Sequence, residues 1–232
     1  MEVILKALIC IFAAYFATAE VNLNLKNTVT LRGEVNDNSI LDLQDKLALL
    51  DAERDSEDYP IYLVIDSRGG SIQAGLNFIE FAKTIKNLHT INLFAASMAS
   101  AIQQALPGKR IGLENSVSMF HRPSGEFKGQ FGEGEVESRL QFSKDRAAIF
   151  ESINAARMQL SLKDYRVKVI NEYWVVGVEN LKQHIVDEID SVRCDSALIK
   201  ATEDLEGIRF SSCPLFRTGR DISTITPKNT QK

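Results

Sequence analysis

The chain has 232 residues, of which 44% are hydrophobic and 25% are charged, the composition of a globular protein with a sizeable core. Its formal net charge at pH 7 is -4. Nucleic-acid binding requires a basic face that neutralises phosphates, so this charge argues against a nucleic-acid partner.

The first nineteen residues have the pattern of a secretory signal peptide. One early lysine precedes the apolar block ALICIFAAYF, and Ala17-Thr18-Ala19 follows it, which is the small-residue pattern that a signal peptidase cleaves. The apolar block is shorter than the roughly 20 residues that span a bilayer. We therefore expect cleavage after Ala19 and a mature chain that is secreted or periplasmic. The alternative is an uncleaved N-terminal anchor that starts at Val3.

The sequence after the signal alternates between strand-like and helix-like patterns. Runs of β-formers predict strands, and apolar residues at helical spacing predict helices. In chain order these are a strand over 28–35, a helix over 40–52, a strand over 61–65 that ends at Gly69-Gly70, a helix over 71–85, a strand over 89–94 and a helix from about 97. This alternation predicts an α/β fold with a parallel sheet, and it places functional loops at the carboxyl ends of the strands.

The second half of the chain begins with a short predicted strand over 116–120 that leads to His121. The glycine-rich stretch SGEFKGQFGEGE follows and predicts a flexible loop or hairpin. Further helices are expected over 136–158, 162–169 and 178–184. The tail from Thr218 has too few large apolar residues to pack, so we expect one domain over 20–215 and a disordered tail over 216–232.

The cysteines are consistent with an exported protein. Cys10 would leave with the signal peptide, and Cys194 and Cys213 flank a predicted hairpin or loop near the end of the domain. An even number of cysteines in an oxidising compartment predicts one disulfide. Two independent buried thiols are the alternative.

Ser97 lies at a predicted strand-to-helix turn, where a serine is either a small packing residue or a nucleophile. A nucleophilic serine needs a base that takes its proton and backbone N–H groups that bind the developing oxyanion. The N–H of Met98 lies at the helix start, and Gly69-Gly70 ends the preceding strand without side chains that would block a substrate. His121 ends the next strand, at the same edge of the sheet. Each feature alone has an ordinary structural explanation, and their joint placement favours a catalytic site.

The other two histidines have simpler interpretations. His89 is a residue at a strand start, and His184 is an exposed helix residue. Neither has a cysteine, an acid or another histidine beside it at ligand spacing, so the sequence predicts no metal site.

Four sequence blocks occur in the order and near-spacing of a known family. IDSRGGSIQAGL is close to that family's SPGG-x-x-x-AG block, AASMAS to its AASMG block, GKRIGLENSVSMFHRP to its GKR…PNS…M-x-H-Q-P block, and GEFKGQ follows. Over roughly 28–192 the chain therefore resembles the proteolytic subunit of the Clp peptidases (ClpP), within the ClpP/crotonase superfamily. The resemblance implies an α/β fold of repeated βαβ units in a spiral, with a protruding handle helix.

The resemblance also implies roles for individual residues. Ser97 would be the nucleophile and His121 the general base, while Gly70 and Met98 would supply the N–H groups of the oxyanion hole. The glycine-rich segment 125–134 and the helix after it would form the handle, through which rings of subunits stack.

The chain departs from the family pattern at several positions. Arg68 replaces the proline of SPGG, and Leu93 and Ala99 replace glycines on either side of the nucleophile. Lys168 stands where the family has its catalytic aspartate. Asn171 or Glu172, and less favourably Asp164, could replace that acid, because amide and carboxylate oxygens accept the histidine Nδ1–H bond. A Ser–His dyad without a third residue is also open.

These observations predict an exported ClpP-like serine peptidase that hydrolyses peptides or unfolded proteins through an acyl-enzyme at Ser97. Hydrolysis of this kind needs no cofactor. Export removes ATP, so an AAA+ ATPase partner is not expected, and ring assembly as a homo-oligomer is implied by the resemblance. A catalytically inactive ClpP-like scaffold or binding protein is the main alternative. A crotonase-like acyl-CoA enzyme is less favoured, because such enzymes use no nucleophilic serine.

Overall fold

The computed structural model describes residues 20–122, 130, 132–205 and 208–216. The predicted signal peptide, nearly all of the predicted tail over 216–232 and most of the glycine-rich segment 125–134 lie outside the described residues.

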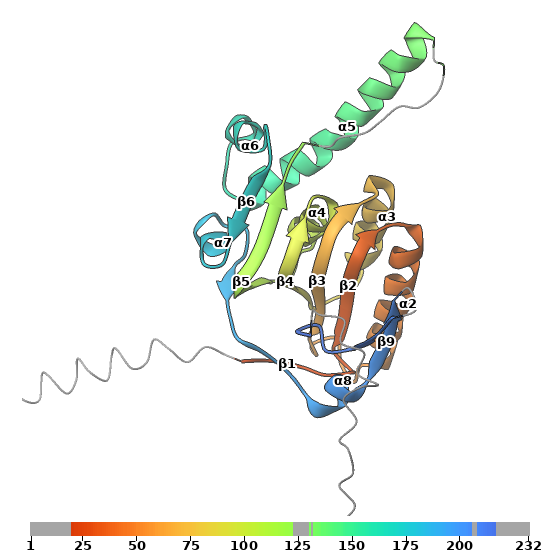
Figure 1. Cartoon of the computed structure of the whole chain (residues 1–232), viewed down its shortest axis with the longest axis vertical. Helices are drawn as coiled ribbons and strands as arrows, with labels where there is room; N and C mark the ends of the chain where they lie inside the picture. Colours follow the sequence, from red (N-terminus) through yellow and green to blue (C-terminus); the bar gives the residue numbers. More distant parts are fainter. Residues whose placement is uncertain (1–19, 123–129, 131, 206–207, 217–232) are drawn as a thin grey trace, which may run out of the picture.

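The centre of the fold is a six-stranded sheet (Figure 1). The strands β2, β3, β4 and β5 are parallel neighbours in chain order, β6 is antiparallel to β5 at its carboxyl end, and β7 is parallel to β5 at its amino end. Their bounds are β2 Thr28–Val35, β3 Ile61–Gly70, β4 Leu88–Ala96, β5 Arg110–Phe120, β6 Tyr173–Val176 and β7 Glu188–Ile189. The predicted α/β fold with a parallel sheet is therefore confirmed.

One face of the sheet is covered by α2 (Asp37–Glu53), α3 (Ile72–Ala82) and α4 (Met98–Ala105), as Figure 1 shows. Leu63 and Ile65 point from β3 into this layer, where they join a core that includes Phe78 of α3 and Ile102 of α4. All four side chains are fully buried. The apolar face of each helix and the continuous apolar run of β3 account for this layered core.

The opposite face of the sheet is covered by the end of the chain. The parallel pair β1 (Val21–Leu23) and β8 (Val192–Cys194) and the short helix α8 (Ser196–Lys200) make this cap. The hairpin of β9 (Thr202–Leu205) and β10 (Ile208–Ser211) follows, and Glu203 of β9 lies 4.0 Å from Lys46 of α2. Leu23, Cys194, Leu198 and Cys213 pack there against strand residues such as Val64. Cys194 and Cys213 form a disulfide with their Cα atoms 5.9 Å apart, which confirms the predicted pairing.

The helix α5 (Glu133–Arg157) extends away from the sheet (Figure 1), as the resemblance implied for a handle. Its carboxyl half packs on α4 and on α6 (Leu162–Lys168). Its outer half carries exposed apolar side chains, among them Leu140 and Phe142. No helix of the described residues is both long enough and apolar enough to cross a membrane.

Several boundaries differ from the sequence-based expectations. The strand β5 begins at Arg110 and not near 116, α5 begins three residues before the expected start, and the helix expected over 178–184 is the short α7 (Glu179–Lys182) followed by a turn. The strands β1, β6, β7 and β8 were not predicted as strands. They have only two to four residues each, too few for a period-two pattern to appear in the sequence. The hairpin or loop predicted between Cys194 and Cys213 is the hairpin of β9 and β10.

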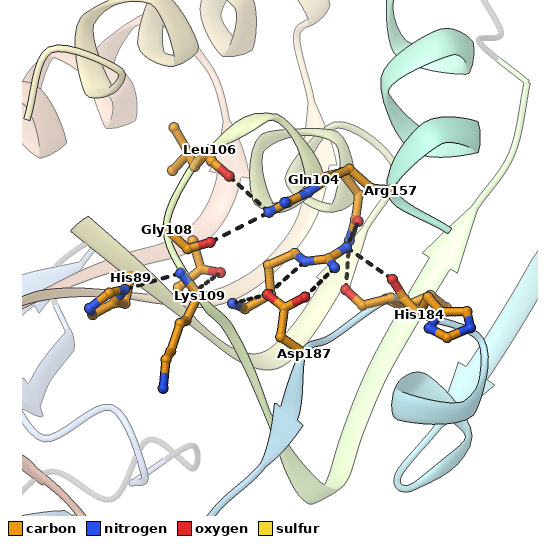
Figure 2. Close-up of polar contacts among 11 residues, drawn as sticks. His89, Gln104, Leu106, Gly108, Lys109, Arg157, His184 and Asp187 are labelled. Atoms are coloured by element: carbon orange, nitrogen blue, oxygen red, sulfur yellow. Dashed lines mark hydrogen bonds and ion pairs between the residues drawn. The ribbon is translucent and has the colours of Figure 1, made fainter. Parts of the chain in front are cut away.

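A buried polar network around Arg110 joins the start of β5 to α4 and to the loop before β7, and Figure 2 labels its members Gln104, His184 and Asp187. The Arg110 guanidinium donates to Asp187 Oδ1 at 2.5 Å and to Asp187 Oδ2 at 3.1 Å. It also donates to Gln104 Oε1 of α4 at 2.5 Å and to the carbonyl of His184 at 2.9 Å. The Arg110 side chain is only 5% exposed, so this charge depends on these partners for solvation.

Arg157 extends the same network to the carboxyl end of α5 (Figure 2). Its guanidinium donates to the carbonyls of Leu106 and Gly108, at 3.1 and 3.4 Å, in the turn between α4 and β5. Burial first, and then the neighbouring charge of Arg110, lower the pKa of Arg157. The network thus lies where α4 ends, β5 begins and α5 ends. This is the side of the sheet opposite to the edge at which β4 and β5 end.

Replacing Asp187 by asparagine will destabilise the fold. The substitution leaves the buried Arg110 charge without its anionic partner, which we expect to cost about 2 kcal/mol of unfolding free energy. Urea unfolding at neutral pH measures the effect. The matched control is Glu188→Gln, which breaks the exposed pair with Lys109 (side chains 36% and 62% exposed) and should change the free energy by less than about 1 kcal/mol. Equal effects of the two substitutions would contradict this role for Asp187.

The pH dependence of stability should carry the signature of the same carboxyl. Burial raises the pKa of Asp187, but the hydrogen bonds and positive charge of Arg110 outweigh burial and hold that pKa below its usual value. Stability from a lowered carboxyl pKa is present above the unfolded-state value of about 3.9 and is lost as the pH falls through the folded-state value. The difference in unfolding free energy between the unchanged protein and Asp187→Asn should therefore shrink below about pH 4, measured by urea titrations across that range. A difference in unfolding free energy that does not change with pH would refute this role of the Asp187 carboxyl.

Candidate active site

Ser97 occupies a sharp turn between β4 and α4. Its backbone has φ 55°, in the left-handed region that residues other than glycine seldom adopt. The Ser97 N–H donates to the carbonyl of Met119 on the neighbouring strand β5 at 2.9 Å, which fixes the turn. The hydroxyl does not cap the helix that begins at Met98. The turn instead directs it toward the carboxyl edge of the sheet.

Gly69 lets this turn approach the end of β3. Its φ is +91°, and a Cβ placed on it would lie 2.6 Å from the Ala96 carbonyl oxygen, 2.7 Å from the Met98 nitrogen and 2.8 Å from the Ser97 Cβ. No side chain fits in that space. The sequence signal Gly-Gly therefore marks a contact of backbone against backbone at the Ser97 turn.

His121 lies beside Ser97, as the order of the strands predicts. It directly follows β5, and the pairing of Ala96 with Met119 brings the ends of β4 and β5 to the same edge. The His121 Nε2 and the Ser97 Oγ are 2.7 Å apart, a hydrogen-bonding distance. Both residues are half-buried, so the pair is shielded but accessible.

Gly70 and Met98 lie at the same edge. Both line one cavity together with Ser97 and His121. Met98 is the first residue of α4, so its N–H has no acceptor four residues earlier within the helix. These positions suit an oxyanion hole, and the assignment of the two N–H groups to it stays a prediction.

Lys168, which the resemblance places at the position of the family's catalytic aspartate, is held by two neighbouring side chains. Lys168 Nζ donates to Gln183 Oε1 at 3.3 Å and lies 4.8 Å from the centre of the Tyr173 ring. A lysine ammonium has no acceptor for the Nδ1–H of His121. Among the described residues, His121 has one hydrogen-bond partner, the hydroxyl of Ser97.

The candidate replacements for the acid are not seen in contact with the histidine. Asn171 and Glu172 are exposed, and Glu172 accepts from the indole Nε1 of Trp174 at 2.8 Å. Asp164 accepts from the hydroxyl of Ser161 at the start of α6 at 2.6 Å. The suggestion that Asn171 or Glu172 orients the imidazole stays a prediction.

A cavity of about 260 Å³ opens beside the serine and the histidine. Its far wall comes from α5 and α6, and these residues were not singled out from the sequence: Ala147, Phe150, Glu151, Asn154 and Tyr165. The first four of them follow helical spacing on one face of α5. Their spacing in the sequence would have identified these four residues as one face of the predicted handle helix, and that face as a wall of the site.

Of the remaining histidines, His89 agrees with its structural interpretation, whereas His184 is exposed but lies in the turn after α7 and not in a helix. His89 lies in β4 and its Nδ1 accepts from the N–H of Lys109 at 3.1 Å (Figure 2). The side chain of His184 is exposed. Within the described residues, no group of three or more histidine, cysteine or acidic side chains could hold a metal ion.

A hydrogen-bonded serine and histidine at the edge of a sheet, with helix-start N–H groups beside them, is the arrangement of a serine hydrolase site. A model of the Clp protease family matches residues 16–193. The chain belongs to the Clp protease family, whose members are serine peptidases of the ClpP type.

Individual relatives agree with this assignment. The ATP-dependent Clp protease proteolytic subunit of Streptococcus mutans is 32% identical over 165 residues, which cover 69% of this chain and 83% of the relative. The proteins of the same name from Streptococcus pyogenes serotype M5 and Streptococcus equi subsp. equi are each 30% identical over 164 residues, with the same coverage. The family match ends at residue 193, just before the disulfide-linked end of the cap.

Substituting alanine for Gly69 should disrupt the Ser97 turn. The new Cβ would collide with the backbone of residues 96–98 and would strain a positive φ, so we expect a loss of about 1–3 kcal/mol of unfolding free energy and loss of labelling of Ser97 by a fluorophosphonate. The control is Gly134→Ala in α5, where an added Cβ has no atom within 4 Å. This substitution should stabilise the helix slightly. Normal labelling and stability of Gly69→Ala would show that the turn tolerates displacement.

Proposed function

We propose that this protein is an exported ClpP-type serine peptidase that hydrolyses peptides or unfolded proteins through an acyl-enzyme at Ser97. The observation that carries the proposal is the 2.7 Å separation of Ser97 Oγ and His121 Nε2 at the mouth of the cavity. A serine hydroxyl is a weak nucleophile unless a base within hydrogen-bonding reach takes its proton.

The reaction follows from this geometry. His121 Nε2 takes the proton of Ser97 as Oγ attacks the scissile carbonyl, and the N–H groups of Gly70 and Met98 stabilise the oxyanion. The imidazolium then gives its proton to the leaving amine, which leaves an ester on Ser97. A water molecule, deprotonated by the same imidazole, hydrolyses the ester and restores the serine. No step requires a cofactor.

Export and assembly are part of the same proposal. The signal-like N-terminus and the disulfide between Cys194 and Cys213 support an oxidising, extracytoplasmic location. Such a compartment lacks ATP, so substrates would be short or already unfolded and would arrive without an AAA+ ATPase. Proteins of the family form homo-oligomeric rings, and the exposed apolar residues Leu140 and Phe142 on α5 support assembly of this chain as well.

A catalytically inactive scaffold is the second candidate. The observation that favours it is Lys168, which is held by Gln183 and Tyr173 and offers no acceptor to the imidazole. Without a group that orients the imidazole and stabilises the imidazolium, a Ser–His pair loses much of its rate. Such a protein would retain the fold for binding or assembly.

Hydrolysis of casein and of short fluorogenic peptides decides between the two candidates. The protein is expressed with residues 1–232, beside Ser97→Ala and Lys168→Asp. An active peptidase loses its activity, and its fluorophosphonate labelling, with Ser97→Ala. If Lys168→Asp leaves the rate unchanged or lower, a dyad or a substitute for the acid such as Asn171 is in place.

Two outcomes contradict the proposal. Activity that survives Ser97→Ala would exclude this serine as the nucleophile. No activity and no labelling in the parent, together with activity in Lys168→Asp, would show a decayed triad and favour the scaffold.

A further inference from the structure

One part of the cavity wall is polar and almost completely buried. Asn154 on α5 and Tyr165 on α6 both line the cavity, and their residues are 5% and 2% exposed. The Asn154 Nδ2 donates to the Tyr165 hydroxyl oxygen at 2.8 Å. The Asn154 Oδ1 is buried and has no hydrogen-bond partner among the described residues. An unsatisfied buried acceptor is costly, so it points to a ligand group that completes it.

The rest of the wall is mostly apolar. Ile72, Met98, Ala101, Phe120, Ala147 and Phe150 line it. The small side chains of Ala101 and Ala147, on two different helices, leave the space beside Ser97 open. A side chain that enters this space therefore has an apolar stem along the wall and needs polar atoms only at its tip, where it would reach Asn154 and Tyr165.

The tip must both donate and accept a hydrogen bond. The Tyr165 oxygen already accepts from Asn154, so the phenol hydrogen is left to be donated, while Asn154 Oδ1 is left to accept. Burial raises the pKa of Tyr165 to about 12, so the phenol keeps this hydrogen at neutral pH. Turning the asparagine amide over exchanges the two roles, and the pair still offers one donor and one acceptor.

The charge of the cavity favours a neutral tip. Glu151 lines the cavity with a side chain that is 13% exposed, and its Oε2 accepts from the Arg166 Nε at 2.7 Å. The acid is therefore already neutralised by a partner. A lysine or arginine side chain would bury a positive charge without a free partner, because Glu151 is already paired. An aspartate or glutamate side chain would be repelled by the Glu151 carboxylate.

We propose that this cavity receives a glutamine side chain from the substrate residue just before the scissile bond. The glutamine carboxamide donates to Asn154 Oδ1 and accepts from the Tyr165 hydroxyl, and its methylene stem packs on the apolar wall. Methionine has a similar length and shape but cannot make either hydrogen bond in full. This inference rests on the proposed peptidase function and names the substrate that the same site prefers.

Two fluorogenic peptides that differ only in glutamine or methionine before the reporter group test the inference. We expect kcat/KM to be about ten-fold or more higher for glutamine, because a site that binds a polar group rejects an analogue without it. Tyr165→Phe and Asn154→Leu should each remove most of this ratio. A purely structural Asn154–Tyr165 contact would instead slow both peptides by the same factor. The matched control is Tyr62→Phe, which removes a half-buried hydroxyl from the opposite face of the sheet and should leave the ratio unchanged.

A binding measurement separates this inference from the peptidase proposal. Fluorescein-labelled peptides that end in glutamine or methionine resemble the acyl product, and their affinities for Ser97→Ala are compared by fluorescence anisotropy. Fluorophosphonate labelling of Ser97 in the parent protein reports the nucleophile without any side chain in the cavity. Labelling with equal or tighter binding and cleavage of the methionine peptide overturns the glutamine inference alone. No labelling and no hydrolysis overturns the peptidase proposal, and the binding comparison then still decides whether the cavity recognises glutamine.

Discussion

The whole site depends on the close contact between Gly69 and the Ser97 turn. The left-handed backbone of Ser97 costs free energy, of the order of 1–3 kcal/mol, and persists because the chain around it is fixed on two sides. The end of β3 packs against it without a side chain, and β5 accepts its N–H through Met119. This turn separates the hydroxyl from its usual place as a helix cap and makes it available to His121.

A second constraint acts at the opposite ends of the same elements. The Arg110 network joins α4 through Gln104, the loop before β7 through Asp187, and α5 through Arg157 (Figure 2). Ser97 directly precedes α4 and His121 directly follows β5, so both residues are positioned by elements whose far ends are fixed. A catalytic pair on such anchored elements keeps its geometry better than a pair on free loops.

The sequence was informative where local pattern decides the structure. The alternation of strands and helices is sufficient to place Gly69, Ser97 and His121 at one edge, because consecutive parallel strands end on the same side of a sheet. It was uninformative where contacts join distant segments. The Asn154–Tyr165 pair and the Arg110–Asp187 pair depend on which side chains meet after folding, and no spacing within one segment reveals them. The short strand β6 was not predicted for a different reason, since four residues are too few to show the alternation of a strand.

The site combines a retained reaction centre with altered surroundings. Ser97 and His121 keep the hydrogen-bonding distance that acyl transfer needs, while Lys168 is directed to Gln183 and Tyr173. In the proposed reaction of a Ser–His dyad, stabilisation of the transition state falls mainly on the N–H groups proposed at Gly70 and Met98 and on substrate binding, which supply catalysis even when a triad member is missing. A cavity that fixes the residue before the scissile bond by two hydrogen bonds contributes to that positioning. In a Ser–His dyad the base is weaker, so the rate depends more on how firmly the substrate is held. This dependence links the proposed contacts of Asn154 and Tyr165 with substrate to the lysine at position 168.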